Sequence, residues 1–573
     1  MAKPSVALSG ITTSLAILVG LALLACWPIL LHGAPDLSWD GAAHAVWAQQ
    51  FASQLWQGDW YPRWFVNINA GYGGPSGFFY PPLTNYISAL FWPLIATKTN
   101  AGWLSSGYSL VLALTLSGIT AYCWLRSITF SRAALLGATI YVIAPYHLAL
   151  DLYLRGASAE LWIFVWLPLV LLSAEALLRG SRWSVPMAAI AYALAILSHP
   201  STALCFAPVA VAYVMLLSPR KQRIRMTSVF AGGLLLGTGL DALYLLPALL
   251  DQHKASVARY TAGIADYRNN WVLPSRGEIA SGARYLLDRL RVRPAALPTG
   301  VAGYGFILLV TLSTVIAIGL LFLLVRRSET NDRIRRIASF YAFITLIAFF
   351  LMTSASAFLW KLAGFLKYLQ FPSRLNVILV VCLAALTAFA VPYLLQARSR
   401  AAAFSLALLA LTWLVIDAWG PRHVYSAWGG NSAKSNRHWV QKQLEPFDMM
   451  PRPAAEQVPK DPAEFDRFLE AHPPKAASIE VPVTGEAAGT AVVESWQPRR
   501  IQFRINSSQD AQLTVNYFYY EGWQGRIKGA KGTLTASPSP EGFIQLNIPR
   551  GDYELTLELP KDTAERAGGL LSL

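Results

Sequence analysis

The stretch Val301–Val325, VAGYGFILLVTLSTVIAIGLLFLLV, decides the fold class because it contains no charged side chain. A helix needs about 20 apolar residues to cross the core of a bilayer. The chain is 54% hydrophobic and 14% charged, whereas a soluble domain is about 25% charged. We therefore predict a polytopic α-helical membrane protein. The long apolar runs are Ile11–Leu31, Leu104–Leu125, Ala133–Leu150, Leu161–Leu178, Met226–Leu250, Val301–Val325, Ile337–Phe358, Val377–Leu395 and Ala402–Ile416.

The charged residues between the runs predict a topology. The net charge is +15, and the short cytoplasmic loops of membrane proteins carry an excess of Lys and Arg. The simplest topology places every basic segment on the cytoplasmic side. These segments contain Lys3; Arg126 and Arg132; Arg179 and Arg182; Arg220, Lys221, Arg223 and Arg225; Arg326, Arg327, Arg333, Arg335 and Arg336; and Arg398 and Arg400.

One apolar segment must then stay on one side of the membrane. Thr84–Thr97 is short for a span and contains Pro93. If it crossed, every later basic loop would face outward, so we predict that it does not cross. Trp183–Leu217 must then hold two spans joined at Ser198–Pro200. The prediction is an arrangement of about eleven spans, with the N-terminus in the cytoplasm and the C-terminus outside.

The composition changes after residue 419. We predict a transmembrane domain over residues 1–419 with its first external loop at 35–103, and a linker with short helices over 420–490. Residues 491–573 alternate between polar and apolar in short runs separated by turn residues, which predicts an extracytoplasmic β-sandwich. The aromatic residues of Phe518–Trp523 are expected in its core, with contact to a glycan as the alternative.

The first external loop carries the leading catalytic candidates. Asp40 and His44 are four residues apart and share a face if the segment is helical. A carboxylate there suits a general base or a ligand for a divalent cation. Alternatively, Ser38 or Asp40 is only the N-cap of a helix. Arg63 follows between aromatic residues, which suits a phosphate partner or interfacial anchoring.

Further ionisable residues occur at span boundaries predicted to lie outside. His147, Asp151, Arg155 and Glu160 fall within APYHLALDLYLRGASAELW. Such residues are functional candidates, although an Arg155–Glu160 or Asp151–Arg155 ion pair could serve only to fix a loop. His199 is another such candidate, and its alternative role is that of a capping or packing histidine. Arg374 could hold a lipid phosphate, or its side chain could only snorkel toward the membrane surface. The sequence has no Cys/His metal spacing, nucleotide-binding fingerprint or G-x-S-x-G motif.

A set of motifs along the whole chain resembles one family. The motifs are G-D-W-Y-P-R-W (Gly58–Trp64), G-Y-G-G-P (Gly71–Pro75), F-F-Y-P-P-L (Phe78–Leu83), Y-L-R-G-A-S-A-E (Tyr153–Glu160), L-S-H-P (Leu197–Pro200), Y-L-L-P-A-L (Tyr244–Leu249), Q-F-P-S-R (Gln370–Arg374) and Y-Y-E-G-W (Tyr519–Trp523). This ordered set is similar to that of the bacterial YfhO-like, or 6-pyruvoyl-tetrahydropterin-synthase-related, integral membrane proteins. Nothing in the sequence supports pterin chemistry.

That group in turn resembles the GT-C glycosyltransferase superfamily. The resemblance implies a polyprenyl-phosphate-linked sugar donor and an acidic catalytic residue in the first external loop, which is Asp40 here. Many members have paired acids at that place. This chain has Asp40 with His44 instead, so the resemblance leaves open whether Asp40 is a base or a ligand of a divalent cation.

The leading hypothesis is an inverting glycosyltransferase of the bacterial inner membrane. Its partners would be a polyprenyl-phosphate-linked sugar, a glycan, lipid or protein acceptor, and the bilayer, with no nucleic acid. The sequence specifies no cofactor, and a divalent cation is compatible with Asp40. Alternatives are a transporter or flippase of lipid-linked glycans, and a non-catalytic scaffold. Asp40 and His44 are the predicted catalytic residues. The predicted substrate-binding residues are Arg63, Tyr80, His147, Asp151, Arg155, Glu160, His199 and Arg374.

Overall fold

The computed structural model describes residues 4–257, 261–262, 265–273, 298–326, 331–394, 400–424, 449–459, 461–481 and 485–573. Lys3, Arg327, Arg398 and linker residues 425–448, which enter the predictions above, lie outside these ranges. The chain divides into two compact units, and each draws on separate parts of the sequence. Unit 1 comprises Met1–Gly41, Ser106–Gly239 and Thr261–Gly430. Unit 2 comprises Ala42–Ser105, Leu240–Tyr260 and Asn431–Leu573.

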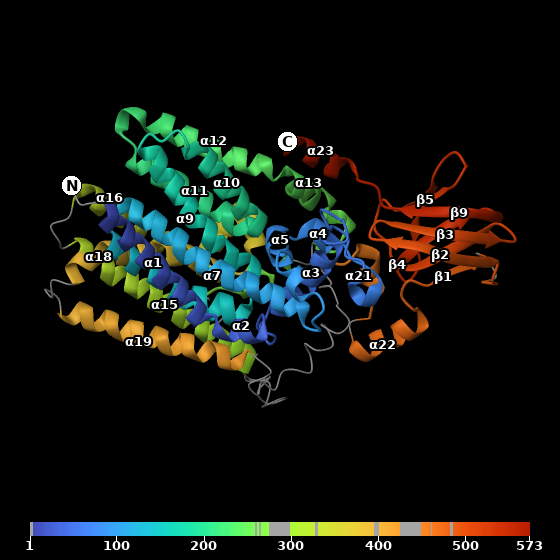
Figure 1. The fold of residues 1–573 in the computed structure, drawn as a ribbon, viewed down its shortest axis with the longest axis horizontal. Coiled ribbons are helices and arrows are strands. Elements are labelled where there is room, and N and C mark those ends of the chain that lie inside the picture. Colours follow the sequence, from blue (N-terminus) through green and yellow to red (C-terminus); the bar gives the residue numbers. More distant parts are fainter. Residues whose placement is uncertain are drawn as a thin grey trace. The chain divides into compact units, whose positions relative to one another are not determined.

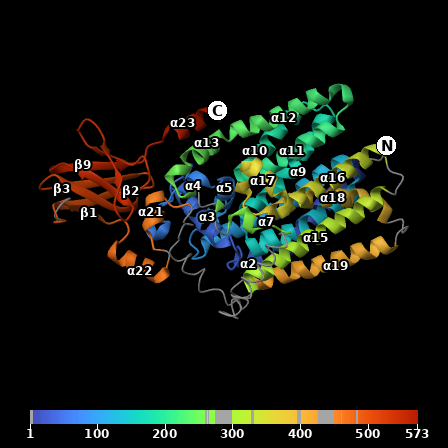
Figure 2. The same ribbon diagram turned by 180° about the vertical axis from the view of Figure 1, so that it is seen from behind.

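Unit 1 is a bundle of long helices (Figure 1). In both views α19 runs along α15 (Figure 2). The elements of unit 1 are α1 (Pro4–Ala25), α2 (Trp27–His32), most of α7 (Ala101–Ile128), α8 (Ser131–Ile143), η2 (Tyr146–Arg155), α9 (Ser158–Leu178), α10 (Ser184–Ser198), α11 (Pro200–Leu217), η3 (Arg220–Gln222), α12 (Arg223–Leu240), η7 (Tyr267–Asn269), α15 (Pro298–Arg326), α16 (Asp332–Leu351), η9 (Ser354–Ser356), α17 (Ala357–Leu362), η10 (Gly364–Leu369), η11 (Pro372–Leu375), α18 (Asn376–Leu394) and α19 (Arg400–His423).

These helices confirm the predicted membrane class. Within the described ranges, seven helices are long and apolar enough to cross a membrane, or eight if the pair Arg220–Leu240 and Ala242–Lys254, broken at Asp241, is one span. Three shorter apolar helices lie at the remaining predicted spans: Gly10–Ala25, Ser184–Ser198 and Ser405–Asp417. The predicted division of Trp183–Leu217 is also confirmed, because α10 ends at Ser198 and α11 begins at Pro200. The protein is a multi-pass helical membrane protein.

The centre of unit 1 is α18. The window Pro372–Val391 is 100% buried, and α18 packs against α8, α15 and α16. Its sequence, NVILVVCLAALTAFAVPYL, is apolar on every face. A helix that is hydrophobic all round can face either lipid or protein, and here the neighbouring helices enclose it. The preceding residue Arg374 is 8% exposed.

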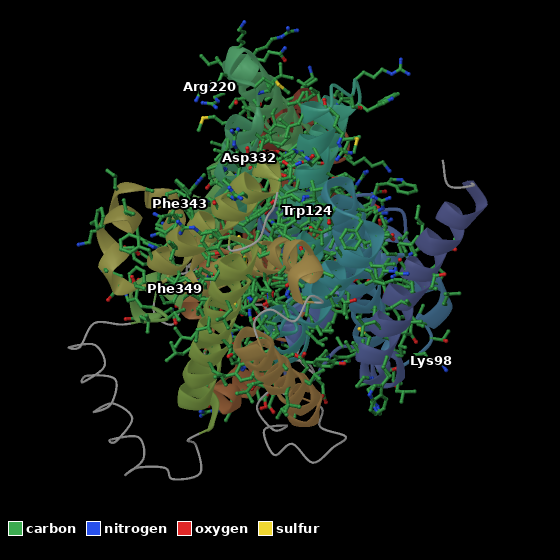
Figure 3. The ribbon with its side chains drawn as sticks, turned by 90° about the vertical axis from the view of Figure 1, so that its left-hand side faces the viewer. Lys98, Trp124, Arg220, Asp332, Phe343 and Phe349 are labelled. Carbon is green, nitrogen blue, oxygen red and sulfur yellow. The ribbon has the colours of Figure 1, made fainter. Side chains whose placement is uncertain are left out.

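The basic loops meet at one end of this bundle. Arg179, just after α9, donates a hydrogen bond to the carbonyl of Ser127 near the end of α7. Arg333, in the first turn of α16, donates to Glu175 Oε2 at 2.7 Å. Figure 3 views this end, where Arg220 and Asp332 are labelled. Residues at the amino end of α9 therefore lie at the opposite end of the bundle from the arginines.

The segment Thr84–Thr97 contains only two short helices. These are α5 (Leu83–Ala89) and α6 (Trp92–Ile95), and neither approaches the length of a span. The helical structure therefore agrees with the prediction that this segment does not cross.

Unit 2 combines the first loop with a C-terminal β-sandwich. All strand pairs are antiparallel, in a four-stranded sheet of order β1-β4-β8-β7 and a five-stranded sheet of order β2-β3-β9-β5-β6. The strands are β1 (Ala477–Glu480), β2 (Gly489–Gln497), β3 (Arg500–Ser507), β4 (Ala511–Phe518), β5 (Gln524–Ile527), β6 (Leu534–Thr535), β7 (Ser537–Pro538), β8 (Phe543–Ile548) and β9 (Gly551–Glu558). The other elements are α3 (Gly41–Leu55), η1 (Asn69–Gly71), α4 (Ser76–Phe79), α5, α6, α13 (Ala242–Leu250), η4 (Asp251–Lys254), α21 (Arg452–Gln457), α22 (Pro462–Ala471) and α23 (Thr563–Leu571).

The aromatic segment Phe518–Trp523 belongs to the core of unit 2. Phe518, Tyr520 and Trp523 are at most 2% exposed. Trp64, from the first loop, donates its indole N–H to the hydroxyl of Tyr517 at 2.7 Å. The core prediction for these aromatics is confirmed, and the same contact joins the first loop to the sandwich within one unit.

Candidate functional site

The π-helix η2 is the scaffold of the candidate site. Pro145 begins it after a break in which Ala144 leaves helical geometry, and the N–H of Leu150 donates to the carbonyl of Pro145 five residues back, at 2.9 Å. A helix closed by such bonds places residues four to five apart on one face. Tyr146, Asp151 and Arg155 have this spacing and are buried together. π-Helical turns are rare and occur frequently at functional sites.

Arg155 is the centre of an ion-pair network. Its Nη1 lies 2.6 Å from Asp151 Oδ1 and 2.6 Å from Glu160 Oε2. The two pairings that the sequence leaves as alternatives therefore exist together. Arg155 is 8% exposed and both carboxylates are at most 1% exposed. Charges at this depth are stable only with close partners, which explains why three ionised groups are gathered here.

Glu160 connects this network to α18. Its Oε1 accepts a hydrogen bond from Tyr146 at 2.7 Å, and its Oε2 lies 3.2 Å from Arg374 Nε. Arg374 is held in turn by Gln370, whose Oε1 accepts from Nη1 at 2.9 Å. Gln370 has a φ of 63°, a strained conformation for a residue with a side chain. Such strain persists only where the surroundings enforce it, and it is concentrated at functional sites.

Asp40 is brought to the network by the backbone of its loop. Its N–H donates to the carbonyl of Arg155 at 2.7 Å, and the N–H of Trp39 donates to Leu154 at 3.0 Å. The Asp40 carboxylate lies 3.5 Å from Arg155 Nη2, and its side chain is 43% exposed. We call Asp40, Tyr146, Asp151, Arg155, Glu160 and Arg374 the Arg155 cluster. Among its three carboxylates, Asp40 alone is accessible to a substrate.

The capping alternative for Asp40 is resolved by Ser38. Ser38 Oγ accepts a hydrogen bond from the N–H of Gly41 at 3.2 Å and donates to the carbonyl of Pro35 at 2.6 Å. Ser38 thus provides the polar side chain at the start of α3. The Asp40 carboxylate is left to face Arg155 and the solvent.

Two of the histidines in unit 1 were predicted to contact substrate, and they differ in role. His199 caps α11, since its Nδ1 accepts a hydrogen bond from the N–H of Thr202. His147 is fully buried, stacks on Phe164 with ring centroids 3.9 Å apart, and bonds through Nδ1 to the carbonyl of Tyr141. His147 therefore packs among aromatic rings, and its contact to substrate stays a prediction.

Two predicted residues pair with each other in unit 2. His44 Nε2 lies 3.4 Å from the hydroxyl of Tyr80, and the rings of His44 and Tyr80 both contact Trp47. His44 is 5% exposed. Asp40 belongs to unit 1, and His44 belongs to unit 2.

Arg63 has a structural environment in unit 2. It is 3% exposed, its Nη2 donates to the carbonyl of Leu243 at 2.7 Å, and its Nε lies 3.2 Å from Glu565 Oε1. Glu565 also accepts two hydrogen bonds from Arg499. Because its charge is already paired with a buried carboxylate, Arg63 ties α23 to the first loop. The expectation that Arg63 holds a substrate phosphate stays a prediction.

The electrostatics of the Arg155 cluster do not favour a resident metal. Within the described part of the chain, no three His, Cys, Asp or Glu residues are placed to hold a metal ion. The accessible carboxylate also faces a guanidinium group, which repels a cation. A general base beside a cation is the chemistry that this arrangement supports.

Sequence reasoning missed Tyr146, Gln370 and Gly156. Each of these residues lies in or next to a motif noted above. Their contacts are with residues distant in the sequence, which the motifs do not indicate. Gly156 has a φ of +61°, and a Cβ added to it would lie 2.5 Å from Ser38 Oγ and 3.0 Å from Gly41 Cα. Its missing side chain lets the Asp40 loop approach η2.

Replacing Gly156 with Ala is therefore expected to displace this loop. The left-handed backbone alone costs about 1–2 kcal/mol, and the contact with Ser38 adds to it. Gly180→Ala is the matched control, because Gly180 has a φ of +76° and no atom within 4 Å of an added Cβ. Thermal unfolding of the purified protein should show a larger loss for Gly156→Ala. Equal losses would contradict the close approach.

Fold and site together define a multi-pass helical membrane protein with a C-terminal β-sandwich domain and a buried ion-pair cluster at one end of its helices. No protein-family model and no curated protein matches the chain. Several solved structures resemble it in part.

The oligosaccharyltransferase of Archaeoglobus fulgidus, tethered with an acceptor peptide, is 15% identical, with a TM-score of 0.41 over 78% of this chain and 60% of that protein. The arabinofuranosyltransferase AftD from Mycobacteria is 16% identical, with a TM-score of 0.40 over 82% of this chain and 31% of its own. ArnT from Cupriavidus metallidurans, bound to undecaprenyl phosphate, is 13% identical, with a TM-score of 0.31 over 87% of this chain and 97% of ArnT. This chain thus spans 60% of the archaeal enzyme's length. At such TM-scores the likeness carries no argument about activity.

Proposed function

We propose that this protein is a glycosyltransferase that moves a sugar from a polyprenyl-phosphate-linked donor to an acceptor of the cell envelope. One observation carries the proposal. A single accessible carboxylate, Asp40, is held beside Arg155 in a network that also holds Arg374 at the amino end of a central helix. In support of the proposal, Asp40 lies beside Arg155, and Glu160 links Arg155 to the second cation, Arg374.

A groove in unit 1 suits the lipid part of the donor. It has a volume of about 990 Å³ and runs between α11 and α16, with walls that include Leu204, Val209, Phe343 and Ile347. At one end it is lined by Leu375, the residue that follows Arg374. A phosphate at Arg374 would therefore have an apolar channel for its chain.

The proposed reaction is a single displacement. The Asp40 carboxylate takes the proton of an acceptor hydroxyl, whose oxygen bonds to C1 of the sugar. The bond from C1 to the phosphate oxygen breaks, and the polyprenyl phosphate leaves with the bonding electrons, which inverts the configuration at C1. Once Asp40 is neutral, its hold on Arg155 Nη2 weakens. That guanidinium group can then stabilise the departing phosphate together with Arg374.

The proposed location is the bacterial inner membrane. The arginine-rich end of unit 1 would face the cytoplasm, which puts the Arg155 cluster on the outer side. In this proposal residues 1–419 form the transferase domain, and the external sandwich begins at β1 (Ala477–Glu480), inside the stretch 420–490 that the sequence predicts as a linker. His199 and Tyr80 remain proposed contacts to substrate, and His44, which pairs with Tyr80, remains a proposed catalytic residue.

Filling the groove tests the proposal. Ile347→Trp should raise the KM for a polyprenyl-phosphate sugar in a transfer assay with purified protein, because the indole occupies space that the chain needs. Leu346→Trp is the control, since Leu346 is 63% exposed on the same helix and does not line the groove. Equal kinetics for the two variants would contradict donor binding here. Lipid translocation without sugar transfer would favour a transporter.

A further inference from the structure

Two helices far apart in the sequence form one element of unit 2. α13 and α23 pack side by side in both views (Figures 1 and 2). A Cβ added to Gly568 would lie 2.5 Å from the carbonyl of Ala242, so the two backbones touch. Ser572 Oγ also accepts a hydrogen bond from the N–H of Leu243 at 2.8 Å. We call these helices the α13–α23 pair.

The pair is fixed by charged residues at its inner side. Glu565 of α23 is 3% exposed and binds Arg63 and Arg499. Asp562 caps α23 by accepting from the N–H of Glu565 at 2.9 Å and pairs with Lys254 at 2.6 Å. α23 is therefore an anchored helix with a defined orientation.

The outer side of the pair is apolar. Leu570 and Leu571 are 75% and 66% exposed, and Leu249 and Leu250 of α13 are each 59% exposed. α23 thus buries a carboxylate and exposes leucines, the reverse of a helix on a soluble protein. Removing each leucine from water would gain about 1.5–3 kcal/mol, so such a face is expected to have an apolar partner.

The chain identifies that partner as lipid. α13 follows α12 with only Asp241 between them, and the two helices pass together as a membrane span broken at that residue. α12 exposes Leu235 and Leu236 by 71% and 54%, as a lipid-facing helix does. α13, which follows α12 in the chain, also exposes leucines. Arg566 on α23 supplies the flanking cation typical of helices that lie in a headgroup layer.

We infer that the α13–α23 pair lies in the membrane interface, with its leucines among the lipid chains, and anchors the β-sandwich unit to the bilayer surface. The C-terminal helix is then a membrane-binding element. This inference goes beyond the proposed transfer reaction and does not depend on it.

Site-specific photocrosslinking of the full chain tests the inference. Benzoylphenylalanine is placed singly at Leu571, Leu250, Leu235 or Val492 in protein reconstituted in phosphatidylglycerol and phosphatidylethanolamine liposomes, and adducts are identified by mass spectrometry. Val492 is the matched control, because it is 58% exposed on a strand of the sandwich. Leu235 reports a membrane span.

The expected result is lipid adducts at 571, 250 and 235, and none at 492. Lipid adducts at 235 without any at 571 would overturn the inference. Adducts of 571 to a second copy of the chain would also overturn it. Because the readout is independent of catalysis, its failure would leave the proposed transfer untouched.

Discussion

Asp40→Asn is expected to abolish sugar transfer while leaving the protein folded. The amide keeps the shape of the side chain and the backbone bond from Asp40 to Arg155, but it cannot accept the proton of the acceptor hydroxyl. Loss of a general base costs about 10²–10⁴-fold in rate. The measurement is kcat with a labelled polyprenyl-phosphate sugar and purified protein.

Asp36→Asn provides the control for Asp40→Asn. Asp36 lies in the same loop and is also partly exposed, but it has no place in the proposed reaction. Its kcat should stay close to that of the wild type. Transfer that survives Asp40→Asn would exclude Asp40 as the base and favour the scaffold hypothesis. An equal loss in both variants would indicate that the loop, rather than the Asp40 carboxylate, is needed.

Arg155→Met is expected to cause the largest loss of stability. It leaves Asp151 and Glu160 buried without the cation that lies 2.6 Å from each. Removing one partner of a buried ion pair costs about 3–5 kcal/mol. The free energy of unfolding, measured by denaturant titration in mixed micelles, should fall by that amount.

A control variant and a double variant test whether unpaired buried charge causes the loss of stability in Arg155→Met. Arg179→Met removes an arginine whose side chain is 51% exposed at the other end of the bundle, so its cost should stay below about 1 kcal/mol. Adding Asp151→Asn to Arg155→Met should recover part of the loss, because one stranded carboxylate becomes neutral. Without recovery in the double variant, burial of unpaired charge would not explain the loss.

The sequence indicated five of the six residues of the Arg155 cluster, all except Tyr146. Asp151, Arg155 and Glu160 fall within one short run, and their spacing already allowed ion pairs. The run did not indicate that both pairs form, because this depends on the wider π-helical turn of η2. It also did not indicate that Tyr146 would share Glu160 with Arg155.

Arg63 has a partner that local reasoning did not predict. An arginine between aromatic residues near a membrane suggested a phosphate, but Glu565 neutralises it from the other end of the chain. No local sequence pattern indicates a partner that is so distant along the chain. The same holds for His147, whose neighbours in the fold are aromatic rings.

The sequence by itself determined the class of the protein. Apolar run length, loop charge and strand alternation are local properties, and each reflects a local physical requirement for lipid, water or a sheet. The tertiary structure decided which of the polar residues act together. Asp40 reaches Arg155 only because Gly156 lets its loop approach η2, and Arg374 joins them only because α18 is enclosed. Buried charges need partners in space, and their positions along the chain do not specify those partners.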